Sequence, residues 1–490
     1  MIDFVLNGQP RQCEATPDTS VLELLRETLG ATGTKEGCAT GDCGACTVAI
    51  GEPGSDGKLR YHSANACITP AHQLQGRHLV TVEGLAEGNA LHPAQAAMVE
   101  CHGSQCGFCT PGIVMSLFTL HEQQRHAPAP LTQQRLEATL GGNLCRCTGY
   151  RPIRDAALSM ASHADNRPAW LDAAAPRDKK PHAFNLDTGF MQPTTLAELT
   201  ECLKQHPKAR LVAGGTDLWL ETTQRLTRFP HVIDVTRVAE LNLIEEATPE
   251  EGLQGWWIGA AVSYSRLEPL LAEHYDAFAH LLHRLGSQQV RNRGTLGGNI
   301  ANASPIGDTP PVLLALESRL RLVGPQGERE LPLADFFLDY KRTALKEGEA
   351  IRAVFLPRPT AKQNLKVWKL SKRREDDISA LLGAFAWRLE DGVMRDVRLA
   401  FGGMAAIPKR AARAEAALEG QVPDTAAFQA ARDALSEDFQ PMSDVRGSAQ
   451  YRQLSAANLL ERLRLVILND TQASIETEQP REVMLHAYAH

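Results

Sequence analysis

Cysteine is the residue type whose distribution along this chain points most directly to chemistry. The chain has 490 residues and 11 cysteines, and most of these cysteines fall into two groups of four within the first third. The first group is Cys38, Cys43, Cys46 and Cys67, and the second is Cys106, Cys109, Cys145 and Cys147. Thiolates bind iron and zinc and also take part in redox reactions. The first third is therefore expected to carry metal or redox chemistry.

The first group has three closely spaced cysteines and a distant fourth, in the pattern C-x4-C-x2-C typical of plant-type [2Fe–2S] sites. Gly37, Gly41 and Gly44 lie among these ligands. Glycine permits positive φ and lets backbone N–H groups approach an anionic cluster closely. We therefore predict a [2Fe–2S] cluster in a β-grasp, ferredoxin-like domain over residues 1–85, with strands on either side of the loop.

The second group consists of two cysteine pairs that each precede a predicted helix. After Cys109, Thr110 is expected as the N-cap and Pro111 as the first helical residue. Residues 92–101 and 131–140 also have helical patterns, which predicts a four-helix, cluster-binding domain over residues 86–161. Cys101 lies nearby but is not counted as a ligand. The spacing of this group is also compatible with structural zinc, and the sequence leaves that alternative open.

Length and composition limit the other possibilities. The length predicts about three domains, and 43% hydrophobic with 22% charged residues indicates a globular protein. A net charge of −7 argues against nucleic acid as the main partner, and no apolar run is long enough to span a membrane. The first residues lack the features of a secretory signal, so we expect a cytoplasmic protein without disulfides. Residues 162–190 are rich in alanine, proline and charge and predict a surface linker.

Two glycine-rich segments stand out in the middle of the chain. A predicted strand ends in Gly214-Gly215-Thr216-Asp217, where successive N–H groups could hold a phosphate, although a plain turn is the commoner interpretation. Residues 293–308 form a second glycine-dense stretch that suits backbone beside a large anionic cofactor, and neither segment is a Rossmann fingerprint. The charged residues 371–378 are interpreted as a solvated loop rather than a gate beside a cofactor. No catalytic metal or nucleophile constellation occurs in residues 376–490.

These motifs together resemble a known family. Residues 37–48, 65–67, 105–112 and 143–153 are similar to the two iron–sulfur domains of the molybdenum hydroxylases. Residues 211–218, 295–299 and 371–378, with Asp308, resemble the family's FAD domain, and residues 401–404 and 444–452 resemble the segments that follow it. The similarity covers nearly the whole chain in family order. It implies an α+β multidomain protein, with an α+β FAD-binding domain over residues 191–375 and a small α+β domain over residues 376–490.

The resemblance also implies cofactors and their contacts. It implies two [2Fe–2S] clusters, with the helical one nearer the molybdenum centre, and one FAD. Gln105 would face the molybdopterin cofactor of a partner subunit, and Leu285 occupies a position where the family commonly has an aromatic residue beside the flavin ring. The implied FAD contacts are Leu211, Val212, Ala213, Gly214, Gly215, Thr216, Asp217, Leu218, Leu285, Thr295, Gly298, Asn299, Asp308, Ile351 and Lys369.

Within the family, the domain order resembles the separate iron–sulfur/FAD subunit of bacterial xanthine dehydrogenases, since no residues for a molybdopterin domain follow. The resemblance implies a molybdopterin-binding large subunit as partner, in a heterodimer that dimerises further. Electrons from the oxidation of hypoxanthine or xanthine to urate would pass through both clusters to FAD and then to NAD+. No catalytic side chain is expected on this chain. The alternatives are the same role in a hydroxylase of aldehydes or N-heterocycles, and a non-catalytic zinc or redox-sensing protein.

Overall fold

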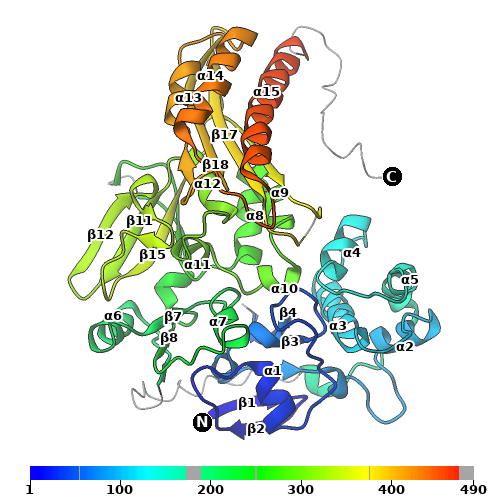
Figure 1. The fold of residues 1–490 in the computed structure, drawn as a ribbon. Coiled ribbons are helices and arrows are strands. Elements are labelled where there is room, and N and C mark those ends of the chain that lie inside the picture. Colours follow the sequence, from blue (N-terminus) through cyan, green and yellow to red (C-terminus); the bar gives the residue numbers. More distant parts are fainter. Residues whose placement is uncertain (55, 173–188, 249–250, 375, 474–490) are drawn as a thin grey trace.

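The computed structural model describes residues 1–54, 56–172, 189–248, 251–374 and 376–473. The N-terminal part forms a five-stranded sheet in the order β2-β1-β5-β3-β4, in which β1 and β5 are parallel (Figure 1). Ser20 caps a helical segment that packs on it, α1 (Val21–Glu23) continued by the π-helical η1 (Leu24–Thr28). The strands are β1 (Ile2–Leu6), β2 (Gln9–Cys13), β3 (Thr47–Pro53), β4 (Leu59–Asn65) and β5 (His78–Val80).

The next domain is helical and lies beside this sheet (Figure 1). Its helices are α2 (Pro93–Glu100), α3 (Thr110–His126), α4 (Gln133–Leu140) and α5 (Arg151–Ser159). The expectation that Thr110 is an N-cap is wrong by one residue, because Cys109 holds the N-cap position without a side-chain cap bond. Pro111 is thus the second helical residue, where its missing N–H costs nothing because first-turn N–H groups have no intrahelical partner.

The chain after α5 stays on the helical domain for at least another ten residues. Arg167 makes two hydrogen bonds of 2.7 and 2.8 Å to the buried carboxylate of Glu122 in α3. Leu171, in the 3-10 turn η6 (Ala169–Asp172), is buried in the same core. The first part of the predicted linker is therefore bound to the helical domain, while residues 173–188 of that linker lie outside the described residues.

The third part contains two sheets joined by short helices. A parallel three-stranded sheet has the order β6-β8-β7, and an antiparallel five-stranded sheet has the order β12-β11-β15-β10-β9. The strands of the first are β6 (Phe190–Met191), β7 (Arg210–Val212) and β8 (Val232–Asp234). Those of the second are β9 (Ile244–Glu246), β10 (Gly255–Gly259), β11 (Arg319–Gly324), β12 (Gly327–Pro332) and β15 (Ala350–Pro357). A short hairpin pairs β13 (Phe337–Asp339) with β14 (Arg342–Thr343).

The helices of this part are α6 (Leu196–Gln205), α7 (Leu220–Thr223), α8 (Tyr264–His274), α9 (Asp276–His283), α10 (Gln288–Arg291), α11 (Leu296–Ala301) and α12 (Thr309–Ala315). Of these, α8, α9 and α12 lie toward the C-terminal domain, and α6 and α7 lie near β7 and β8 (Figure 1). The apolar side chains of α8, α9, α11 and α12 form one large core with β10, β11 and β15, whereas those of α6 pack in a separate core with the parallel sheet.

The C-terminal domain is a four-stranded antiparallel sheet in the order β16-β17-β18-β19. The strands are β16 (Asn364–Leu370), β17 (Leu381–Glu390), β18 (Val393–Gly402) and β19 (Lys409–Arg410). The helices α13 (Ala412–Leu418), α14 (Thr425–Asp438) and α15 (Ala449–Ala473) follow. β16 precedes the expected boundary at 375, yet its hydrogen bonds to β17 attach it to this sheet.

Strand β17 is buried on both of its faces. Successive side chains of a strand point to opposite faces of the sheet. Leu381 and Phe385 accordingly pack in the core under α13–α15. Leu382 and Ala384 pack on the opposite side, in the large core of the preceding part that includes β10, β11 and β15. This double burial explains the nearly continuous apolar sequence of β17 and fixes the C-terminal domain to the preceding one. Among the described helices, none is both long enough and apolar enough to cross a membrane.

Candidate cofactor sites

The structure brings the first cysteine group together at one loop. The Sγ atoms of Cys46 and Cys67 lie 3.3 Å apart, and the N–H groups of Thr40 and Cys43 each donate to Cys38 Sγ at 3.4 Å. A hydrogen bond from the thiol of Cys43, with smaller contributions from these N–H groups, lowers the pKa of the Cys38 thiol to about 4. Thiolates with backbone N–H donors around them are the ligands that an iron–sulfur cluster requires. The residues of this loop therefore fit a [2Fe–2S] cluster.

Glycines are required where this loop turns around its sulfur atoms. Gly41 has φ +79°, and a Cβ at this position would lie 2.3 Å from Ile68 Cδ1. A Cβ on Gly37 would lie 2.7 Å from Cys43 Sγ. The spacing of glycine and cysteine in the sequence is thus explained by the tight approach of the loop to its own ligands.

The second cysteine group also converges, between the starts of α3 and α5. Cys106 is hydrogen-bonded to Cys147, and Cys109 to Cys145. Cys106 and Cys147 are exposed, as is the neighbouring Gln105, so one edge of this site faces the protein surface. The four thiols form one compact set that can hold a metal cluster.

Cys101 is not part of the second site. Its Sγ lies 3.5 Å from the hydroxyl of Ser159 in α5. Cys101 is close in sequence to the second cysteine group, but its side chain contacts α5. This position agrees with leaving Cys101 out of the predicted ligands.

The two cysteine loops touch each other through their backbones. The N–H of Leu144 donates to the carbonyl of Cys43 at 2.9 Å, and Leu144 directly precedes Cys145. A Cβ on Gly44 would lie 2.0 Å from the carbonyl oxygen of Gly142. A hydrogen bond therefore connects a cysteine of one site to the residue beside a cysteine of the other.

The two glycine-rich segments of the middle part lie back to back. A Cβ on Gly214 would lie 1.8 Å from the carbonyl oxygen of Arg293, so only glycine is compatible with this approach. Gly215, at φ +78°, lies against Ile68, the residue after Cys67, and a Cβ there would be 2.7 Å from the Ile68 carbonyl oxygen. The first glycine loop is thus in direct contact with the first cysteine site.

The predicted FAD contacts gather around these two loops. Leu211 and Val212 end β7, and Ala213, Gly214, Gly215, Thr216, Asp217 and Leu218 form the loop that follows. Thr295 caps α11 by accepting from the N–H of Gly298 at 3.0 Å, and Asn299 Oδ1 accepts from the Thr309 hydroxyl at 2.6 Å. Ile351 is buried in β15, and Leu285 packs against the same core. The fold therefore brings the two glycine loops into contact, while their role in binding FAD stays a prediction.

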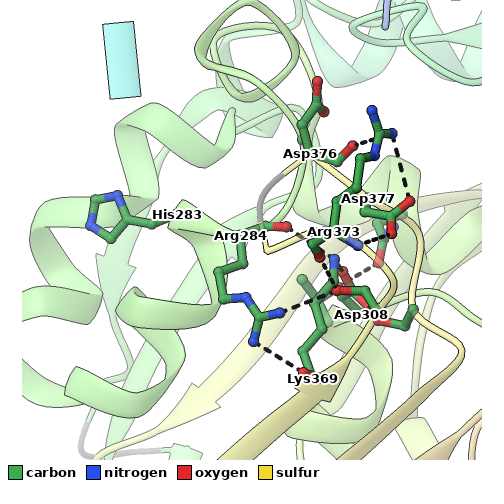
Figure 2. Close-up of polar contacts among 12 residues, drawn as sticks. His283, Arg284, Asp308, Lys369, Arg373, Asp376 and Asp377 are labelled. Carbon is green, nitrogen blue, oxygen red and sulfur yellow. Dashed lines mark hydrogen bonds and ion pairs between the residues drawn. The ribbon is translucent and has the colours of Figure 1, made fainter. Parts of the chain in front are cut away.

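Asp308 and Lys369 form a buried ion pair at this site (Figure 2). Lys369 Nζ lies 2.6 Å from Asp308 Oδ2, and their side chains are only 2% and 8% exposed. Ser379 donates to the other carboxylate oxygen at 2.5 Å, and Lys369 Nζ also donates to the Arg284 carbonyl at 3.0 Å. Two residues predicted separately as FAD contacts thus hold each other in place.

Arg284 and Ser379 are site residues that the sequence did not reveal. The guanidinium of Arg284 donates to the carbonyls of Lys369 at 3.0 Å and Arg374 at 2.9 Å (Figure 2). It also donates to the Ser371 hydroxyl at 3.2 Å. An isolated arginine in a helical stretch gives no signal of this role, because its partners lie 85 to 90 residues further along the chain.

The charged segment 371–378 is anchored on both sides rather than simply solvated. Arg373 lies 3.5 Å from Asp42 in the first cysteine loop, and its N–H donates to Asp377 at 2.8 Å. Lys372 Nζ donates to the carbonyl of Val445 in the C-terminal domain at 2.8 Å. Burial raises the pKa of Asp376 to about 6. The described residues of this segment therefore bridge the first cysteine site and the C-terminal domain.

Comparison with protein-family models agrees with this division of the chain. Residues 4–72 match a "2Fe-2S iron-sulfur cluster binding domain" and residues 81–158 match a "[2Fe-2S] binding domain". Residues 183–359 match an "FAD binding domain in molybdopterin dehydrogenase", and residues 366–466 match a "CO dehydrogenase flavoprotein C-terminal domain". The second cysteine group thus belongs to an iron–sulfur domain, which argues against structural zinc there.

Similar proteins are found among curated sequences and solved structures. Xanthine dehydrogenase of Drosophila subobscura is 31% identical over 95% of this chain, and that of Emericella nidulans 32% over 96%. The chain spans only 39% of the length of each of these relatives.

Among structures, carbon monoxide dehydrogenase from Hydrogenophaga pseudoflava is 32% identical with a TM-score of 0.53, covering 56% of this chain and 94% of that one. Quinoline 2-oxidoreductase from Pseudomonas putida 86 is 27% identical with a TM-score of 0.51, covering 56% and 95%.

Proposed function

We propose, from the premise that this chain belongs to the molybdenum hydroxylase family and carries its two [2Fe–2S] domains and its FAD domain, that it serves the oxidation of hypoxanthine and xanthine. In this proposal electrons leave a molybdenum centre on a partner polypeptide, pass through both clusters and FAD, and reach NAD+. When bound, the clusters exchange one electron at a time and the flavin exchanges one or two. The similarity to two xanthine dehydrogenases over nearly the whole chain supports this substrate.

The residues of this chain have positioning roles in the proposal. Cys38, Cys43, Cys46 and Cys67 would hold the cluster in the β-grasp domain. The helical cluster would be held by Cys106, Cys109, Cys145 and Cys147. The exposed edge of the helical site, with Gln105, would face the molybdopterin of the partner. The loops at 213–218 and 295–299 would hold FAD, and the Asp308–Lys369 pair would support the wall of that site.

One observation carries the proposal: the three candidate cofactor sites are in direct contact in the order that electron transfer needs. The helical site is joined to the β-grasp site by the 2.9 Å hydrogen bond from Leu144 N–H to the Cys43 carbonyl. The β-grasp site is joined to the first FAD loop where Gly215 lies against Ile68. A storage or sensing protein has no need to align its sites in this way.

A second candidate is the same electron-transfer role for another substrate. The similarity to quinoline 2-oxidoreductase and carbon monoxide dehydrogenase supports it, because chains of these proteins match 56% of this chain. An aldehyde or N-heterocycle would then replace xanthine. This chain holds no substrate pocket in the proposal, so the partner decides between the two.

The cofactor part of the proposal can be tested on the purified chain. We expect about four iron atoms, acid-labile sulfide and one FAD per chain, with two distinct electron paramagnetic resonance signals after reduction. Cys38→Ser and Cys106→Ser should each abolish one signal, and Cys101→Ser is the matched control that should keep both. A protein that contains zinc or no metal, or no flavin, would refute the proposal.

The substrate part needs the complex with its partner. Steady-state rates with xanthine, hypoxanthine, an aldehyde and quinoline should be compared, each with NAD+ and with O2 as acceptor. We expect xanthine and hypoxanthine with NAD+ to be the best combination. Turnover of quinoline or the aldehyde without turnover of xanthine would instead select the second candidate.

A further inference from the structure

Side chains from the three cofactor-binding parts meet at one buried amide, that of Gln289 in α10. Its Nε2 lies 3.2 Å from Thr47 Oγ1, 3.3 Å from Ser116 Oγ and 3.2 Å from Asn143 Oδ1. Thr47 follows Cys46 directly, Ser116 lies in α3, and Asn143 lies two residues before Cys145. All four side chains belong to residues that are at most 2% exposed. The amide therefore connects the FAD domain to both cysteine loops.

The partners of Gln289 are themselves bound to the loop of the first cysteine site. The carbonyl of Gly44, next to Cys43, accepts from Asn143 Nδ2 at 3.0 Å and from the Thr47 hydroxyl at 2.7 Å. Asn143 Nδ2 also donates to Thr47 Oγ1 at 3.2 Å, and the Ser116 hydroxyl donates to Asn143 Oδ1 at 2.6 Å. The amide of Gln289 thus completes a network whose other members hold the two cysteine loops against each other.

The site of Gln289 is specific for a side chain with nitrogen donors. Its Oε1 stands against Gly142, where a Cβ would lie 2.3 Å away, and it has no hydrogen-bond partner among the described residues. Its Nε2 in contrast faces three oxygen atoms. An apolar side chain of the same size would remove this donor from all three buried oxygens. Thr47 Oγ1 and Asn143 Oδ1 would each keep one other donor, and Ser116 Oγ would lose the donor that Gln289 supplies, which is costly.

We propose that Gln289 is a positioning residue that sets the contact between the two iron–sulfur clusters from the FAD domain. Gln289 holds Asn143 and Thr47, and these two side chains hold the Gly44 carbonyl. In this arrangement the N–H of Leu144 reaches the carbonyl of Cys43. The inference rests on the proposed function, since the two cysteine groups must hold clusters. It extends that function, because a residue of the flavin-binding part controls the electron-transfer contact between the other two cofactors.

The size of the effect follows from the network. The variant would take one buried hydroxyl oxygen's donor away and leave the other two oxygens with one donor each. Gln289→Met should therefore raise the population in which the two loops have separated by about tenfold, which corresponds to about 1.4 kcal/mol. Hydrogen exchange of the Leu144 amide reports this population, since that N–H exchanges when its bond to Cys43 opens.

The experiment compares Gln289→Met with Gln288→Met in the complete enzyme. Gln288 is the matched control, because its Nε2 donates to Ser265 at 3.1 Å and Asn292 at 2.7 Å within the FAD domain. Both variants should keep iron and FAD. In Gln289→Met, exchange of the Leu144 amide should be about tenfold faster, and the magnetic splitting between the two reduced clusters should weaken. Gln288→Met should show neither change.

The possible outcomes separate this inference from the proposed function. If Gln289→Met keeps its cofactors but matches Gln288→Met in exchange and splitting, the inference is overturned while the proposed function stands. If the unsubstituted protein lacks either cluster signal, the proposed function itself fails. Should Gln289→Met lose iron or FAD, Ser116→Ala decides instead: faster exchange of the Leu144 amide supports the network, and unchanged exchange overturns it.

Discussion

The buried ion pair between Lys369 and Asp308 allows a prediction whose size can be worked out. Lys369→Met removes the positive charge with little change in volume and leaves the Asp308 carboxylate, 8% exposed, with the Ser379 hydroxyl at 2.5 Å. Breaking one side of a buried pair costs about 3–5 kcal/mol. We therefore expect the variant to lose about 3–5 kcal/mol of stability at pH 7.

The size of this loss can be expressed as a change in melting temperature. Since 1 kcal/mol shifts the melting temperature of a domain of this size by about 2–4 °C, the variant should melt about 6–20 °C lower at pH 7.

The assay is thermal melting of the full chain at pH 7, with FAD release as a second readout. Lys366→Met is the matched control, since Lys366 lies in the same strand β16 and is half-exposed. Adding Asp308→Asn to Lys369→Met should recover much of the loss, because no unpaired charge then remains. A Lys369→Met protein as stable as the Lys366→Met control, or a double variant no more stable than Lys369→Met, would refute the reasoning.

Two further predictions concern the helical domain. Burial alone would raise the pKa of Glu122, but hydrogen bonds from His121 and Arg167 lower it to about 2. The ionised carboxylate therefore contributes about 3 kcal/mol to the stability of the fold above pH 4.5, and this contribution is lost as the pH falls toward 2. Arg167→Leu should therefore lower the melting temperature most at pH 7 and by less than half as much at pH 3, where about 1.4 kcal/mol of the contribution remains, and equal losses at both would contradict this. Gly44→Ala would place a Cβ 2.0 Å from the Gly142 carbonyl oxygen, at a residue with φ +66°. Limited proteolysis should therefore cut this variant between the two cluster domains faster than it cuts the control Gly57→Ala, in which nothing lies near the added Cβ.

Local sequence signals were enough to identify the cysteine sites and the glycine loops. Ligand spacing such as that of Cys38, Cys43 and Cys46 is a property of a short loop, and glycine is needed wherever that loop approaches its own sulfur atoms. The membership of Cys67 and the exclusion of Cys101 also followed from spacing, together with resemblance to the molybdenum hydroxylases. The structure gathers each group as expected, and the family models assign both to iron–sulfur domains.

Details at the edges of elements were less predictable. The start of α3 lies one residue earlier than the cap pattern at Thr110 indicates, because a helix can begin without a side-chain cap. β16 could not be assigned to the C-terminal sheet from its own sequence, since only its pairing with β17 decides this. The attachment of residues 163–172 to the helical domain depends on Arg167 finding Glu122, which is 45 residues away in the sequence.

The sequence by itself thus determined which cofactors this protein is built to hold, because cysteine spacing and glycine placement are written within short segments. Only the tertiary structure decided how the sites face one another. Gln289 and Thr47 are 242 residues apart and meet in one buried hydrogen bond, and Arg373 reaches Asp42 across an even longer separation. Such contacts depend on which surfaces pack together, and that is settled by the burial and shape of whole domains rather than by any local pattern.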